Sequence, residues 1–218
     1  WTLDLNGELR NGQGQWNLAA DDLDVAKVIA LIPTALLTDP ETLKLTGTVN
    51  LTAKAVTTTQ GSRLVADATW TNGGLTSGAF DFSGISAQIH ADNGAQARTA
   101  STELLIDIKS AQSTEGQVTG RLTLANLDAP NLEFAGNVTV GIAEFLRWID
   151  ITTWDEASGS AQGTLGFTQH YASLDELGNQ GVWGGMWSGT LALSPGRWRP
   201  QGNSVALEVQ GGELDLLG

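Results

Sequence analysis

The stretch LKLTGTVNLTAKA at residues 43–55 alternates strictly between two kinds of side chain. Leucine, glycine, valine and alanine hold the odd positions, whereas lysine, threonine and asparagine hold the even ones. Because successive side chains of a β-strand point to opposite faces, this period of two predicts a strand with one apolar and one polar face. Gly47 stands mid-strand on the apolar phase, where glycine marks a bend or the close approach of another strand.

The same alternation recurs along most of the chain. It reappears at residues 64–70, 104–108, 118–124, 132–140, 159–167, 187–193 and 205–209. Segments rich in Gly, Asn, Asp and Pro separate these runs and predict turns at residues 10–14, 72–74, 91–94, 195–196 and 210–212. About ten to thirteen strands are expected from this spacing. The predicted fold class is mainly β: a strongly curved antiparallel sheet, either a U-shaped groove or sandwich-like, with two short amphipathic helices.

A shorter repeat, apolar–x–Gly–x–apolar, lies within the strands. Its copies centre on Gly7, Gly47, Gly120, Gly136 and Gly189, always on the apolar phase. Glycine weakens the interior of a strand and marks a bend, so a recurring set on one phase predicts a sheet that coils tightly around its apolar side.

Two segments break the alternation and predict the helices. Residues 24–32 and 142–149 carry apolar side chains at helical spacing on one face. Each follows a strand and precedes a glycine-bearing strand, so a strand–helix–strand unit occurs twice. The chain is expected to be one β-rich segment of a larger protein, because alternation runs to both of its ends. It divides into two related modules, residues 1–130 and the incomplete 131–218.

Composition excludes several classes of function. The net charge is −13 with only 11 basic residues, which argues against binding to a phosphate backbone and therefore against a nucleic-acid partner. The absence of cysteine excludes disulfides, zinc–thiolate sites and cysteine nucleophiles. No apolar run reaches the roughly 18 residues of a membrane-spanning helix.

No catalytic, metal or cofactor site is expected. The sequence contains no Gly-x-Ser-x-Gly, His-Glu-x-x-His or phosphate-loop motif. His90 falls on a polar phase and is interpreted as a surface residue, and His170 has no accompanying ligand set. Asp21, Asp22 and Asp24 lack the spacing and glycine of a calcium loop, so helix capping is the favoured interpretation.

Several stretches resemble the AsmA-like family of bacterial envelope proteins, a branch of the repeating-β-groove group that includes TamB. The likeness lies in residues 23–33 leading into 43–49, in residues 122–127, and in residues 136–140, 145–149 and 157–163. The Trp-rich stretch from residue 183 to 198 departs from the family pattern. The resemblance implies a periplasmic protein anchored in the inner membrane. It also implies a hydrophobic β-groove for phospholipid transport between the membranes or for outer-membrane assembly.

In that interpretation the apolar phases line a lipid groove and contact phospholipid acyl chains. The candidate lining residues are Leu45, Val49, Leu51, Leu122, Leu124, Phe134, Val138, Val140, Leu165, Phe167, Leu191 and Leu193. Packing in an ordinary core is the competing interpretation of each residue. The cargo, its direction of travel and the partner proteins stay open.

Two other functions stay open at this point. Eight tryptophans and an acidic, Thr- and Asn-rich polar face would also suit a β-sandwich module that binds carbohydrate or serves in an adhesin. An open sheet edge that binds protein would suit a structural spacer. Coplanar exposed tryptophan rings would favour the carbohydrate module.

Overall fold

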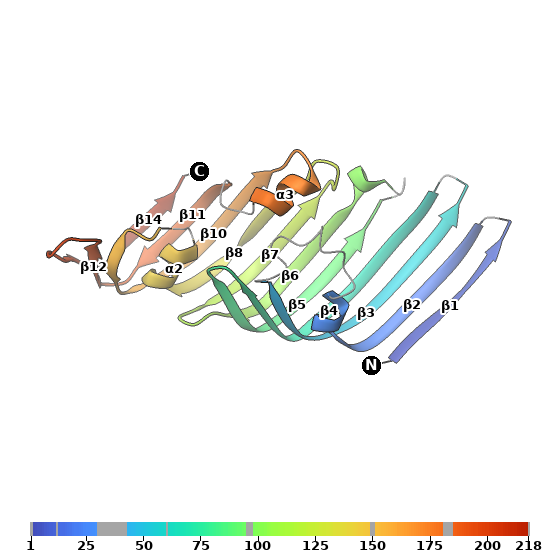
Figure 1. The fold of residues 1–218 in the computed structure, drawn as a ribbon, viewed down its shortest axis with the longest axis horizontal. Coiled ribbons are helices and arrows are strands. Elements are labelled where there is room, and N and C mark those ends of the chain that lie inside the picture. The colour runs from blue at the N-terminus through green and yellow to red at the C-terminus, as the bar shows by residue number, and fades with distance from the viewer. Residues whose placement is uncertain are drawn as a thin grey trace.

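A computed structural model describes residues 2–11, 13–29, 43–59, 61–94, 98–148, 151–180 and 185–217. Eleven strands form one antiparallel sheet in the order β1-β2-β3-β4-β5-β6-β7-β8-β10-β11-β14 (Figure 1). Their bounds are β1 Thr2–Arg10, β2 Gln13–Asp24, β3 Lys44–Thr58, β4 Gly61–Ser77, β5 Phe80–Asp92, β6 Glu103–Gln112, β7 Gln117–Ala125, β8 Asn131–Gly141, β10 Ser160–His170, β11 Met186–Leu193 and β14 Gly212–Leu216. The sheet is not closed into a barrel, so the prediction of a curved, mainly β fold is confirmed.

The remaining elements lie at the two ends of the strands. Helix α1 (Val25–Ile29) joins β2 to β3, and α2 (Ile142–Trp148) lies between β8 and β10 at the same end, here called the α2 end. Helix α3 (Leu174–Gln180) follows β10 at the opposite end, the α3 end (Figure 1). A small sheet, β13-β12-β9, lies beside the α2 end; its strands are Leu207–Val209, Gly196–Pro200 and Trp154–Ala157. A 3-10 turn covers Thr99–Ser101.

Both predicted helices are present where the structure describes them. Residues 30–32 of the first prediction and residue 149 of the second lie outside the described residues. In each case the helix connects two neighbouring antiparallel strands, β2 with β3 and β8 with β10. β9 of the small sheet also lies between α2 and β10 in the chain, whereas no strand of the described residues lies between α1 and β3. The module boundary at residues 130–131 falls at the start of β8, which pairs with the whole of β7.

The strand registers place the apolar phases on one common face. One transverse row crosses eight successive strands, β3 to β8, β10 and β11. It consists of Leu51, Ala68, Ile89, Ile106, Leu122, Phe134, Phe167 and Trp187. A slip of one residue in any strand would move that strand's apolar set to the opposite face. The consistent register therefore builds a continuous apolar surface out of local alternation.

A line of β-bulges crosses the five neighbouring strand pairs from β2–β3 to β6–β7 at the α2 end. Register shifts occur at Ala20/Leu23, Thr46/Thr48, Trp70/Leu75, Ser83/Ala87 and Ile108/Ala111. Four residues in this line have positive φ: Asp22 (55°), Gly47 (106°), Asn72 (50°) and Gly84 (57°). Because a bulge bends its strand, the aligned bulges bend this end of the sheet as a unit.

The prediction of a turn at residues 72–74 is wrong. These residues lie inside β4, which continues to Ser77, and the turn to β5 is at residues 78–79. Asn-Gly-Gly usually marks a turn because such residues tolerate positive φ. Here the same tolerance serves a bulge, with Gly73 buried against the Trp70 ring.

Candidate functional site: an apolar cavity on the concave face

A cavity of about 390 Å³ lies on the apolar face between β4 and β11. Its lining is entirely aliphatic or aromatic. The lining residues are Trp70, Leu75, Phe80, Phe82, Ile85, Ala87, Ile106, Ile108, Ala111, Val118, Leu122, Leu132, Phe134, Trp148, Leu165, Phe167 and Trp187. Its volume falls in the range of about 300–1,000 Å³ that is typical of small-molecule sites.

Three aromatic rings close the cavity at the α2 end. Phe80 and Phe82 project from the start of β5, and Trp148 is the last residue of α2. The centroid of the Trp148 ring lies 5.4 Å from that of Phe82 and 6.2 Å from that of Phe80. β6 and β7 separate β5 from β8 in the sheet, so these contacts bridge the apolar face. The sheet is therefore concave on its apolar side.

Helix α2 is fixed to the sheet by a buried carboxylate. Glu144 is only 3 % exposed. One of its oxygens accepts hydrogen bonds from Ser113 Oγ at 2.9 Å and from the backbone N–H of Glu115 at 2.8 Å. These donors belong to the turn between β6 and β7. Beside them, Ile142, Phe145 and Trp148 pack on the apolar face of β8 and β10.

Helix α3 and Tyr171 pack at the other end of the strands. Tyr171 is buried with Leu132 and Phe167, and Leu177 of α3 packs against this group. Burial raises the pKa of the Tyr171 hydroxyl above its ordinary value, and the nearby Glu176 carboxylate adds to that shift. This helix was absent from the sequence prediction. Its signal is Ser173-Leu-Asp-Glu176, in which Ser173 Oγ accepts from the Glu176 N–H, as at a helix N-cap.

The predicted lining residues fall into four places on the apolar face. Leu122, Phe134, Leu165 and Phe167 line the cavity. Val138, Val140, Leu191 and Leu193 pack with α2 in the main core, and Leu124 packs near Tyr171. Leu45, Val49 and Leu51 are half-buried on β3, on the same face but outside the cavity.

Most of the cavity lining was not among the predicted residues. Ile106 and Ile108 belong to an alternating run that the sequence already shows. Phe80, Phe82 and Trp148 could not have been chosen in this way, because bulges and a helix bring them to the cavity from outside the strand repeat. Trp148 is 3 % exposed, and its indole N–H has no hydrogen-bond partner in the described part of the chain.

The tryptophans do not form a flat exposed platform within the described residues. Trp70, Trp148 and Trp187 line the cavity. Trp154 and Trp198 meet edge to face at an interplanar angle of 74° beside the small sheet. Trp16 is the exposed member of the described set. Trp1 and Trp183 lie outside the described residues.

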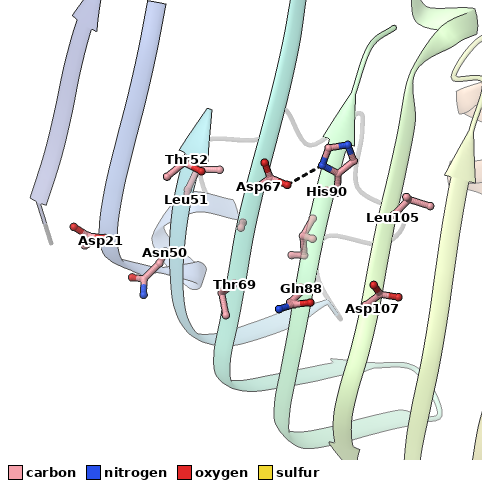
Figure 2. Close-up of a pocket in the computed structure, with 12 residues that line it drawn as sticks. Asp21, Asn50, Leu51, Thr52, Asp67, Thr69, Gln88, His90, Leu105 and Asp107 are labelled. Atoms are coloured by element: carbon pink, nitrogen blue, oxygen red, sulfur yellow. Dashed lines mark hydrogen bonds and ion pairs between the residues drawn. The ribbon is translucent and has the colours of Figure 1, made fainter. Parts of the chain in front are cut away.

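The opposite face of the sheet is polar. Figure 2 shows a depression across strands β2 to β6. Its polar lining residues are Asp21, Asn50, Thr52, Asp67, Thr69, Gln88, His90 and Asp107, and Leu51, Ala68, Ile89 and Leu105 complete the lining. His90 Nδ1 lies 2.8 Å from Asp67 Oδ1 on the neighbouring strand, and both side chains are exposed. His90 is therefore a surface residue, as its phase predicted. Asp24 Oδ1 accepts from the Ala26 N–H at 3.0 Å and caps α1.

Two cross-strand ion pairs hold this polar face. Arg63 donates to both carboxylate oxygens of Asp92, and Arg121 does the same to Asp107 at 2.7 and 3.1 Å. These hydrogen bonds lower the pKa of Asp92 and of Asp107 below the ordinary carboxyl value. Among the described residues, no three His, Asp or Glu side chains cluster closely enough to hold a metal ion.

No helix in the described ranges is long and apolar enough to cross a membrane. In comparisons with known proteins, no protein-family model, curated protein or solved structure matches the chain.

Proposed function

We propose that this chain is a non-enzymatic segment of an AsmA-like envelope protein and binds phospholipid acyl chains on its concave face. The observation that carries the proposal is the wholly apolar lining of the cavity between β4 and β11. The apolar lining continues along strands β5, β4 and β3 at Ile89, Ala68 and Leu51. The sheet thus offers hydrocarbon a continuous surface.

The chemistry of the lining favours hydrocarbon over peptide or sugar. Backbone groups of the strands are already paired in the sheet, so the floor of the cavity offers a ligand few donors or acceptors. A peptide or glycan inside it would leave polar groups unpaired, at about 1–3 kcal/mol each. An acyl chain carries no such groups and gains about 0.8 kcal/mol for each buried methylene.

The cellular context of the proposal rests on the family resemblance. It places the full-length protein in the periplasm, anchored in the inner membrane, with phospholipid transport or outer-membrane assembly as its role. The net charge of −13 supports the view that the partner is not a nucleic acid.

Lipid loading of detergent-free protein tests the proposal. Native mass spectrometry after incubation with phospholipid vesicles should show a bound lipid on the folded wild-type chain. Leu122→Glu should abolish loading, because it places a carboxylate in the apolar lining. Leu64→Glu is the matched control, since Leu64 lies on the same face but is 46 % exposed and outside the cavity. Folded wild-type protein that binds no lipid would contradict the proposal.

A further inference from the structure

We infer that the ring cluster of Phe80, Phe82 and Trp148 is the blind end of the acyl-chain site and sets the longest chain that it accepts. This inference rests on the proposed function and adds a specificity determinant to it. All three rings belong to the cavity lining.

The cluster is a wall because it is built from two sides of the concave face. Phe80 and Phe82 stack on each other with centroids 6.2 Å apart on β5. Trp148 meets both from α2, with the closer contact at 5.4 Å. Hydrocarbon advancing along the strands toward the α2 end therefore meets packed aromatic rings.

The wall is held rigidly on both sides. On one side, Glu144 ties α2 to the turn between β6 and β7, and Phe145 is buried in the main core. On the other side, the bulges of β4 and β5 fix the hairpin that carries the two phenylalanines. Since the rings cannot retreat without breaking these contacts, a chain that is too long must leave methylenes in water.

The same wall fixes the orientation of the ligand. The cavity extends from Trp148 toward Leu132 and Trp187, which lie nearer the α3 end. Burying a charged head group against three aromatic rings would be costly. The methyl end of the chain therefore lies against Trp148, and the head group lies away from it.

The test uses a graded series of single-chain saturated lysophospholipids, each two carbons longer than the last, in native mass-spectrometric competition. For the wild type, affinity should rise by about tenfold with each step and stop rising at a limiting length, because two further methylenes then stay exposed. Trp148→Leu should move that limit to longer chains by at least one step. Ala111→Leu should move it to shorter chains, because Ala111 lines the cavity and a larger side chain fills it.

Three controls separate the outcomes. Trp154→Leu removes a tryptophan outside the cavity and should leave the limit unchanged. Phe82→Leu trims the wall from its other side, so it should lengthen the limit even where Trp148→Leu fails to fold. Trp148→Phe keeps an aromatic wall but removes the indole N–H, and the limit should move by less than one step.

Two results would overturn the inference while leaving the proposed function intact. One is binding by the wild type without a limiting length, or with a limit that neither wall variant moves. The other is loss of binding at every length in folded Trp148→Phe, because the indole N–H would then hold the head group. Failure of the wild type to bind any member of the series would instead contradict the proposed function itself.

Discussion

Gly136 lies on β8, where the sheet leaves no room for a side chain. A Cβ at this position would lie 2.2 Å from the carbonyl oxygen of Thr119 and 2.7 Å from the Phe134 ring. Gly120, its partner on β7, is equally confined by Ala135 and Gly136. Two facing glycines let β7 and β8 approach and bend, which is the role that the glycine repeat predicts.

Gly136→Ala should therefore destabilise the protein. Overpacking typically lowers the free energy of unfolding by about 1–3 kcal/mol, and here the obstructing atoms are backbone, which yields little. Urea unfolding measures the loss. Gly212→Ala is the control, because nothing lies within 4 Å of a Cβ at Gly212. Equal stability of the two variants would show that the close approach of β7 and β8 does not require glycine at position 136.

The ion pair of Asp107 with Arg121 predicts a pH dependence. Its hydrogen bonds lower the pKa of Asp107, so the pair stabilises the fold above the ordinary carboxyl pKa of about 4. This contribution is lost as the pH falls through the lowered pKa of the folded state. Asp107→Asn should thus be less stable than the wild type at neutral pH and equally stable at about pH 2.

Urea unfolding at both pH values measures this difference. The same substitution made in Arg121→Gln protein should show no such pH-dependent difference, because the partner charge is gone. A deficit of Asp107→Asn that persists unchanged at low pH would assign its effect to packing instead.

At the scale of elements, α2 depends on one buried carboxylate. Glu144→Ala leaves the Ser113 hydroxyl and the Glu115 N–H without the oxygen that accepts their hydrogen bonds. It should lower the free energy of unfolding by about 1–3 kcal/mol. Hydrogen exchange at the Glu115 amide should accelerate as well. Glu144→Gln keeps an acceptor oxygen and should lose less. Glu133→Ala, on an exposed β8 position, is the control. Unchanged exchange at Glu115 in Glu144→Ala would contradict this role.

The line of bulges is the second device at this scale. Asn72 holds a positive φ of 50° inside β4, a conformation that costs a residue with a Cβ roughly 1–2 kcal/mol and a β-branched residue more. Asn72→Val should destabilise the fold and weaken the near-ultraviolet circular dichroism of the packed aromatic rings. Asn72→Gly should leave both unchanged. If valine is tolerated as well as glycine, the bulge does not bend β4 in the way inferred here.

At the scale of the whole molecule, the sheet presents an edge. Within the described residues β1 pairs with β2 alone, and its apolar-phase Leu3 and Leu5 are 53 % and 63 % exposed. A free edge of this kind pairs readily with another strand. The chain should therefore self-associate with rising concentration, and Leu3→Lys combined with Leu5→Lys should suppress this in sedimentation velocity. Leu207→Lys, exposed on β13, should not. If none of the three lysine substitutions changes the self-association, the β1 edge is not the surface through which the chain associates.

Much of this architecture could be predicted from short-range pattern. Alternation gave the long strands and their apolar phase, and helical spacing gave α1 and α2. The prediction of a turn at residues 72–74 was wrong because a turn and a bulge both favour residues that tolerate positive φ. Helix α3 was missed, since its seven residues follow a strand without an apolar stripe and only Ser173 and Glu176 signal its start. The short strands β9 and β12 carry too few residues for a period to show, whereas β13 lies within the alternating run at residues 205–209.

The sequence by itself determined which face of each strand is apolar, because side-chain alternation is a property of the local backbone. Only the tertiary structure decided where that face is packed and where it is open. Val138 and Leu122 share one phase, yet α2 buries Val138 and leaves Leu122 facing the cavity. Trp148 of α2 meets Phe82 of β5 across the apolar face, and contacts between residues so distant in sequence leave no periodic trace.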